Sequence, residues 1–205
     1  PYTYAYGNPL RFIDKEGMLP VEPDKNGAIG LTNLMQNLKF ANVKSLSDLR
    51  AYYGGANPYG SQGTPNDNSK TARYVYSNRW GWIDMKHFST AADLTSTWYI
   101  TGRQVLERGE KNEADQERSP YHSTRNSAYS YEDLVSNLIG VYFDTWLESD
   151  EAKKIGNFDD QLKSFFKDLD VVEDPSNSPN WDDMPEDEDE AEKKPYGKVV
   201  KDPTY

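Results

Sequence analysis

The stretch RYVYSNRWGWIDMKHFSTAADLT, residues 73–95, carries the strongest structural signal in this 205-residue chain. Its first residues belong to the run Thr71–Tyr76, whose β-branched and aromatic side chains predict a strand. The strand ends in the sequence Arg79-Trp80-Gly81-Trp82, and the spacing of apolar residues predicts one long helix from Ile83 to about Leu106. A strand followed at once by a helix indicates a domain that contains both kinds of element.

His87 is one of only two histidines, and helical spacing places it on an apolar face of the predicted helix. The same face carries Ile83, Ala91, Leu94 and Trp98. Asp84, three residues earlier, is the neighbour of His87 on the helix surface. A buried histidine bonded to a carbonyl, with an aspartate favoured by the helix dipole, explains this pair without function. The same pair can also bind a metal ion, or the aspartate can orient the imidazole as a general base.

Aromatic and cationic residues lie close to this pair in the sequence. The Trp80-Gly81-Trp82 turn is expected to place two indole rings at the lip of the helix, and Arg73 and Arg79 add positive charge. Because aromatic rings pack well against sugars and peptides, Trp80, Trp82 and the two arginines are predicted binding residues.

Helical spacing recurs along most of the chain. It predicts helices at Leu31–Ala41, at Asn157–Leu169, and from a capping box at Ser45–Asp48 to about Tyr53. A second capping box, Ser130–Asp133, starts a strongly periodic helix. One side of that helix carries Leu134, Leu138, Val141, Tyr142 and Thr145. A loop is expected at 54–70, and a loop or a frayed helix at 109–126. The prediction is therefore a mainly helical α+β domain.

The start of that periodic helix is a second place where function can lie. Glu132 and Asp133 occupy its first turn, which helix capping alone explains. Asn137 lies four residues after Asp133 on the same face, and a buried amide there needs hydrogen-bond partners. Gly140 allows that face to approach another backbone closely.

The first 18 residues contain a compact motif. Tyr2, Tyr4 and Tyr6 alternate as in a strand, and turns follow at residues 7–9 and 14–17. The segment resembles the closing motif of the RHS (YD-repeat) repeat-associated core, Y-x-Y-x-x-N-N-P-L followed by D-P-x-G and an apolar residue. The matching residues are Tyr2, Tyr4, Asn8, Pro9, Leu10, Asp14, Gly17 and Met18. Gly7 and Lys15 depart from the motif, which has Asn and Pro at those positions.

This resemblance implies a domain order. Residues 1–18 would end an RHS core, 19–172 would form a toxin or effector domain, and 173–205 an acidic, proline-rich tail. Proteins of this family serve in competition between bacteria, with type VI secretion as one delivery route. The RHS shell of the parent protein and a cognate immunity protein are the partners implied. Many members cleave themselves near this junction, but Lys15 replaces the usual proline, and a turn residue also explains Asp14.

The two central segments together resemble an uncharacterised family of bacterial envelope-associated proteins. That family combines G-[WF]-I-D-x-x-H and A-D-x-T with a later S-x-[YF]-S-x-E-D-L-x-S-N motif. The matching residues are Gly81, Trp82, Ile83, Asp84, His87, Ala92, Asp93, Thr95, Ser127, Tyr129, Ser130, Glu132, Asp133, Leu134, Ser136 and Asn137. The resemblance implies that Asp84, His87 and either Glu132 or Asp133 converge in a cleft. A histidine and two carboxylates are sufficient for a metal-assisted or acid–base hydrolase.

Composition narrows the function further. The net charge is −11, and the eight acidic residues and two lysines of segment 182–194 carry more than half of it. Because nucleic-acid-binding domains normally present a basic face, this balance disfavours a nuclease. The absence of cysteine excludes disulfides, thiol nucleophiles and thiolate metal sites. The sequence contains no run of 18 apolar residues, so no membrane-spanning helix is predicted. The HExxH, GxSxG, P-loop and Rossmann signatures are absent as well.

These observations favour an antibacterial effector, a hydrolase acting in the periplasm of the target cell with peptidoglycan as the expected substrate. The predicted catalytic residues are His87, as base or metal ligand, with Asp84 and Glu132 beside it. The predicted binding residues are Trp80, Trp82, Arg73, Arg79, Asn137 and Asp133. The sequence leaves the cofactor undecided, with a divalent metal ion as one possibility. Two alternatives also remain, a cytoplasmic nuclease-type toxin and a non-enzymatic binding module that uses its aromatic groove.

Overall fold

The computed structural model describes residues 27–53, 72–118, 131–179 and 181. The described elements are α1 (Leu31–Phe40), α2 (Leu46–Tyr52), β1 (Tyr74–Ser77), β2 (Gly81–Asp84), α3 (Met85–Thr95), α4 (Gly102–Glu117), α6 (Tyr131–Leu147), α7 (Asp150–Ile155), α8 (Phe158–Asp168) and the 3-10 helix η4 (Pro175–Asn177). The described part is mostly helical with one small antiparallel sheet, which confirms the predicted α+β class. The RHS-like motif, the loop 54–70, residues 127–130 and the segment 182–194 lie outside the described residues.

The two strands form a hairpin in which Tyr74 pairs with Asp84 and Ser77 with Gly81. The Ser77 hydroxyl accepts hydrogen bonds from the backbone N–H groups of Arg79 and Trp80, at 3.1 and 3.0 Å. Gly81 has φ +76°, a left-handed conformation that glycine adopts without steric cost. These features make a three-residue turn between the strands.

The helix predicted from Ile83 to Leu106 is wrong in two places. Residues 81–84 are a strand because they pair with β1, and Asp84 caps α3, which begins only at Met85. The helical stretch is then interrupted between Thr95 and Gly102. Trp98 lies in this interruption and is 95% exposed, so it does not share a buried face with His87.

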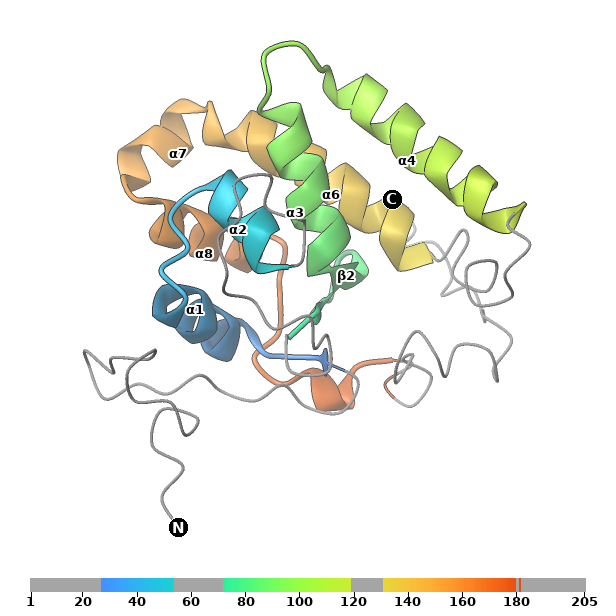
Figure 1. Ribbon diagram of the computed structural model, residues 1–205. Coiled ribbons are helices and arrows are strands. Elements are labelled where there is room, and N and C mark those ends of the chain that lie inside the picture. The colour runs from blue at the N-terminus through green and yellow to red at the C-terminus, as the bar shows by residue number, and fades with distance from the viewer. Residues whose placement is uncertain (1–26, 54–71, 119–130, 180, 182–205) are drawn as a thin grey trace, which may run out of the picture.

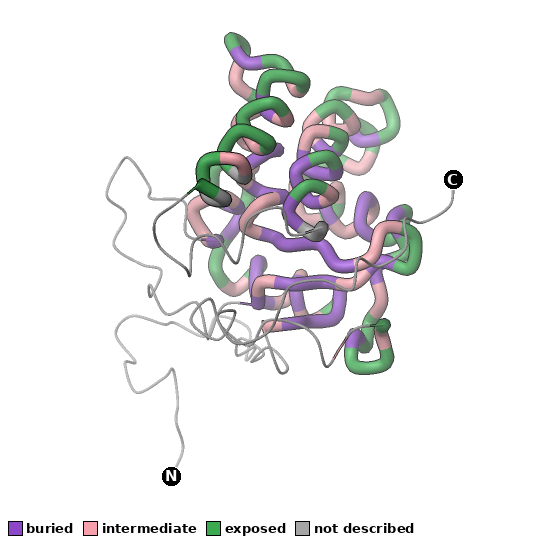
Figure 2. The backbone as a smooth tube through the Cα atoms, turned by 90° about the vertical axis from the view of Figure 1, so that its right-hand side faces the viewer, coloured by how far each residue is buried: buried purple, intermediate pink, exposed green. Residues whose placement is uncertain are grey.

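A new helix, α4, starts after the interruption and extends to Glu117, into the polar stretch for which the sequence left open a loop or a frayed helix. Thr101 and Gln104 form a reciprocal cap: the backbone N–H of Thr101 donates to the Gln104 side chain, and that of Gln104 donates to the Thr101 hydroxyl. This helix is polar and exposed along most of its length (Figure 2). A capped helix whose outer face is solvated needs few apolar residues, which explains why the apolar spacing missed it.

Helices α3 and α6 pack against each other at the centre of the molecule, with α2 and α4 also against α3 and with α1 against α8 (Figure 1). Gly140 makes the central contact possible: a Cβ atom there would lie 2.3 Å from the carbonyl oxygen of Phe88. Beside this contact Phe88 and Phe143 lie 5.4 Å apart, and Phe165 and Phe166 of α8 complete an aromatic core. Buried rings of this size dominate the apolar area that drives folding.

The buried face of α6 differs from the apolar side that its spacing suggested. Leu134, Leu138 and Tyr142 are exposed, at 37, 41 and 57%. The residues buried instead are Asp133, Ser136, Asn137, Ile139, Gly140 and Phe143. The first half of α6 therefore turns polar side chains toward the interior, against α3 and the hairpin.

The chain returns to the hairpin after α8. Val172 accepts a bond from Leu31 and donates one to Tyr76. The indole N–H of Trp82 donates to the Pro179 carbonyl at 3.0 Å, and its ring lies 6.2 Å from that of Trp181. The first residues of the segment that the sequence assigned to the tail thus contact the domain. None of the described helices has the length and apolar character needed to cross a bilayer.

Candidate functional site

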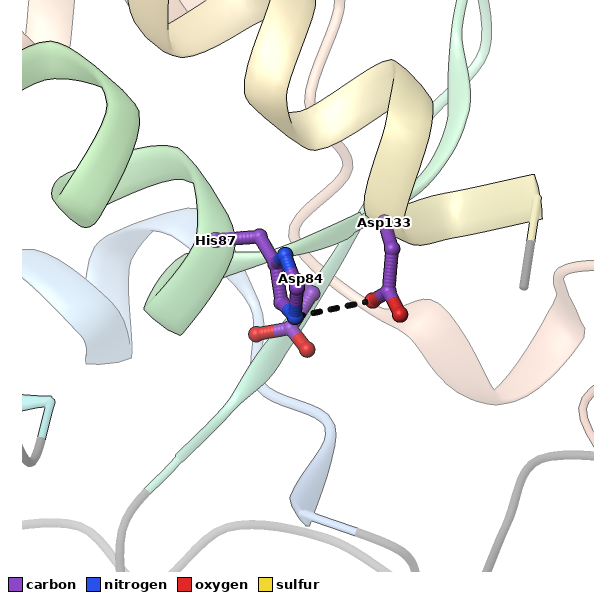
Figure 3. Close-up of side chains that lie close together, drawn as sticks. All are labelled: Asp84, His87 and Asp133. Carbon is purple, nitrogen blue, oxygen red and sulfur yellow. Dashed lines mark ion pairs between the residues drawn. The ribbon is translucent and has the colours of Figure 1, made fainter. Parts of the chain in front are cut away.

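Asp84, His87 and Asp133 come together where the N-terminal end of α3 meets the first turn of α6 (Figure 3). One ligand atom from each residue lies within 4.8 Å of those of the other two. His87 Nε2 lies 3.3 Å from Asp133 Oδ1. The structure therefore brings together three of the residues that the sequence singled out, from segments almost fifty positions apart.

Asp84 is held rigidly from several sides. Its Oδ1 accepts the backbone N–H of Lys86 at 2.8 Å, as the N-cap of α3. Its Oδ2 accepts two bonds from the Arg73 guanidinium, at 2.9 and 2.7 Å. The side chain is fully buried, and a buried carboxylate is stable only with partners of this kind.

The backbone of Asp84 is also fixed. Its N–H donates to the hydroxyl of Ser136, a buried residue of α6, at 2.7 Å. This bond ties the end of β2 directly to the helix that carries Asp133. Ser136 was not among the predicted site residues, although it stands three positions after Asp133, which is the spacing of one helix face.

His87 and Asp133 form the more accessible half of the cluster. The imidazole is 22% exposed and the Asp133 side chain 9%. Asp133 lies in the first turn of α6, where the helix dipole favours a negative charge. The cluster is therefore buried at Asp84 and open to solvent at His87.

Tyr53, the C-cap residue of α2, adds a buried phenol whose electrostatic environment includes Asp84. Its hydroxyl has no hydrogen-bond partner within the described part of the chain. Burial raises the pKa of Tyr53 well above its ordinary value, and the charges of Tyr52 and Asp84 raise it further. Tyr53 therefore stays protonated as an O–H donor within electrostatic reach of Asp84. Nothing in the sequence of α2 marked it.

The structure places the predicted binding residues of the hairpin in different positions. Arg73 pairs with Asp84 and lies 5.2 Å from the centre of the Tyr74 ring. Trp82 is only 5% exposed and belongs to a small core with Ala28 and Tyr74, so it forms no open lip beside His87. Arg79 and Trp80 lie in the hairpin turn, at the opposite end of β2 from Asp84. The lip was expected from a helix beginning at Ile83, and the strand at 81–84 removes it.

The remaining predicted residues lie on α6. Asn137 is buried and faces α4: a Cβ atom on Gly109 would lie 2.9 Å from its Nδ2. Its position therefore fits a packing role between two helices. Glu132 is part of α6, and its side chain lies outside what the structure describes.

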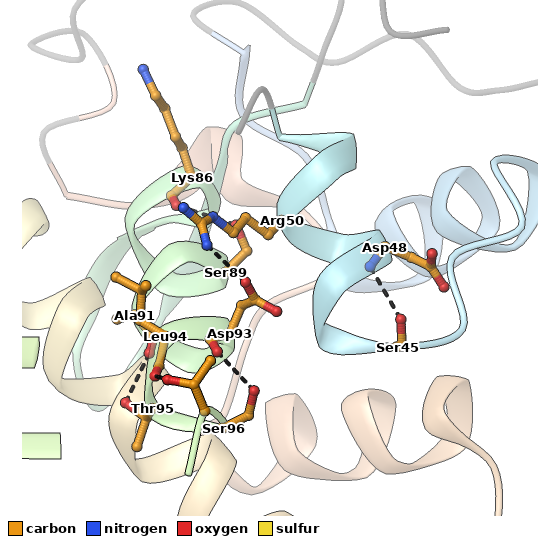
Figure 4. A network of polar contacts seen from close by, with 11 residues as sticks. Ser45, Asp48, Arg50, Lys86, Ser89, Ala91, Asp93, Leu94, Thr95 and Ser96 are labelled. Atoms are coloured by element: carbon orange, nitrogen blue, oxygen red, sulfur yellow. Dashed lines mark hydrogen bonds and ion pairs between the residues drawn. The ribbon is translucent and has the colours of Figure 1, made fainter. Parts of the chain in front are cut away.

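The A-D-x-T residues of α3, Ala92–Thr95, contact α2 and the backbone of α3 itself. Asp93 pairs with Arg50 of α2 at 2.8 Å, and the Thr95 hydroxyl donates to the Ala91 carbonyl (Figure 4). The ion pair holds α2, and with it Tyr53, against α3. These contacts give Asp93 and Thr95 a structural role.

Comparison with family models, with curated proteins and with solved structures found no match to this chain. The two resemblances described above stay predictions, and the geometry of the site carries the functional argument.

Proposed function

We propose that this chain is a hydrolytic antibacterial effector in which Asp84, His87 and Asp133 activate a water molecule. One observation carries the proposal: a partly exposed imidazole and two buried carboxylates converge within 4.8 Å. Burying two carboxylates costs free energy that simple packing does not require. Such clusters are typical of functional sites.

The cluster has the groups needed for either form of water activation. An imidazole oriented by Asp133 can accept a proton from water as a general base. The same three groups can instead hold a cation that polarises the water. Arg73 fixes the orientation of the Asp84 carboxylate in both cases, because it donates two hydrogen bonds to it.

The proposed target is the cell envelope, with peptidoglycan as substrate. The RHS-like motif supports delivery as cargo, and the net charge of −11 disfavours a nucleic-acid substrate. The arginines nearest the cluster support the same choice. Arg73 pairs with Asp84 and Arg50 with Asp93, so both positive charges are already matched by carboxylates.

Expression of the chain in a test bacterium, with and without an export signal, tests the proposal. We expect killing only when the chain reaches the periplasm, and at least about 100-fold less killing by His87→Ala, as for loss of a general base or a metal ligand. Arg103→Ala is the matched control, because this exposed residue of α4 pairs with the surface residue Glu107 and lies outside the cluster. It should kill like the wild type.

Two outcomes would overturn the proposal. Growth arrest only without the export signal would place the target in the cytoplasm and favour a nuclease-type toxin. Full toxicity of a His87→Ala variant that is folded by circular dichroism would remove the cluster from the mechanism.

A further inference from the structure

We infer that Asp84, His87 and Asp133 bind one divalent transition-metal ion, with Zn²⁺ as the first candidate. The inference rests on the proposed function and names the cofactor of the same site. It is argued from the spacing of the ligand atoms, the donor set and the neighbouring phenol.

The spacing of the His87–Asp133 pair fits two ligands of one ion. Zinc ligands about 2.1 Å from the metal in a tetrahedron lie about 3.4 Å apart. The observed Nε2–Oδ1 separation is 3.3 Å, whereas charge-assisted hydrogen bonds usually measure about 2.7–2.9 Å. The third ligand atom, on Asp84, lies within 4.8 Å, which a modest side-chain rotation of His87 and Asp133 can close.

The oxygen that Asp84 offers can be identified. Among the described residues, Oδ2 accepts two hydrogen bonds from Arg73, whereas Oδ1 accepts one, from the backbone N–H of Lys86. A carboxylate oxygen has two lone pairs, so Oδ1 keeps one for an ion. Arg73 and Lys86 then act as the outer contacts that fix a metal-binding carboxylate in place.

The donor set selects the class of ion. One neutral imidazole and two carboxylates supply two negative charges, which match a divalent cation. Nitrogen and oxygen donors suit Zn²⁺ and Mn²⁺, and the absence of cysteine removes the thiolates that softer ions prefer. Mg²⁺ prefers an octahedron of oxygens and should bind more weakly.

Tyr53 supplies an independent observation. Its hydroxyl is buried, has no hydrogen-bond partner within the described residues, and lies within electrostatic reach of Asp84. Leaving such a group unsatisfied costs roughly 1–3 kcal/mol, so it is uncommon unless a ligand completes the site. Three protein ligands also leave the fourth position open, as in catalytic zinc sites.

Calorimetric titration of the untagged 205-residue chain with ZnCl₂, after treatment with a chelator, tests the inference. We expect one zinc ion per chain with a dissociation constant below about 1 µM. Asp133→Asn and His87→Ala should each weaken binding at least about 100-fold. Both variants retain the acidic segment 182–194, so any loss cannot be attributed to weak binding there.

Asp93→Asn is the matched control, because it changes a carboxylate of the same helix that pairs with Arg50 outside the cluster. It should bind zinc like the wild type. Circular dichroism of each variant separates loss of the site from loss of the fold. If a variant unfolds, the milder His87→Gln serves in its place.

Absence of zinc binding by the wild type, or equal binding by folded Asp133→Asn, would overturn the inference. The two proposals fail separately. A chain that kills through His87 but binds no metal keeps the hydrolase and loses the metal. A chain that binds zinc at this site but cleaves no envelope polymer keeps the metal site and loses the proposed function.

Discussion

The two ends of the contact between α3 and α6 follow opposite rules. At one end Phe88 and Phe143 pack with the phenylalanines of α8, and burial of apolar area explains every side chain. At the other end Asp84 and Asp133 are buried among hydrogen bonds, and the burial costs free energy unless each charge is matched. The contrast teaches that one helix pair contains both the core that stabilises the fold and a polar cluster that stability alone does not require.

Tyr53 extends this contrast. Its ring belongs to the main core, but its hydroxyl lacks a partner among the described residues. A phenylalanine would fill the same space without an unsatisfied polar group. Departures from good packing of this kind are expected at functional sites, where other requirements outweigh stability.

The largest expected effect is a difference in unfolding free energy between variants at the two ends of the contact between α3 and α6. Phe143→Ala should cost about 3–5 kcal/mol, because it empties a fully buried ring from the aromatic end. His87→Ala should cost less, about 1–3 kcal/mol, because it leaves the buried Asp133 carboxylate without the imidazole but removes only a partly exposed side chain. Chemical denaturation of both variants measures the difference. Equal losses would mean that His87 and Asp133 are a structural ion pair.

A smaller effect is expected from the glycines that let helices approach α6. Gly140→Ala should cost about 1–3 kcal/mol, because its Cβ would meet the rigid carbonyl of Phe88 at 2.3 Å. The helices must then separate, so zinc affinity and killing should fall as well. In Gly109→Ala the new Cβ meets the movable Asn137 side chain at 2.9 Å, and better helix propensity offsets part of the strain.

Denaturation and zinc titration of the two glycine variants check this expectation. Gly109→Ala should change stability by less than about 1 kcal/mol and leave the cluster intact. If Gly140→Ala leaves both stability and metal affinity unchanged, close packing of α3 on α6 does not set the geometry of the cluster.

Local signals predicted helices α1, α2 and α8 closely. The Ser45–Asp48 cap is present, with the Ser45 hydroxyl accepting from the Asp48 backbone at 3.1 Å. The strand-to-helix boundary at Asp84 was misplaced, because an aspartate in a first helical turn and an aspartate that caps the helix look alike in sequence. Only the pairing of β2 with β1 distinguishes them.

The site was also predictable only in part, because local sequence patterns find only residues that lie close together in the chain. Asp84 and His87 are neighbours in the chain, and the polar residues of early α6 were unusual enough to mark Asp133. The spacing of Leu134 and Leu138 nevertheless pointed to the wrong face, because the buried side of α6 carries the cluster. Tyr53 is brought beside Asp84 by tertiary packing alone, which a local pattern does not encode. Ser136 stands three positions after Asp133 on the same helix, so the helical spacing could have marked it.

The central claim is that the cluster of Asp84, His87 and Asp133 hydrolyses peptidoglycan. Digestion of purified peptidoglycan sacculi tests it most directly, because cleavage of the polymer is then measured without delivery into a cell and without an immunity protein. Soluble fragments released by the wild type and by His87→Ala would be quantified by chromatography. The account predicts release by the wild type and at least about a 100-fold slower release by a variant that still unfolds cooperatively. No release by the wild type, or equal release by the folded variant, would contradict it.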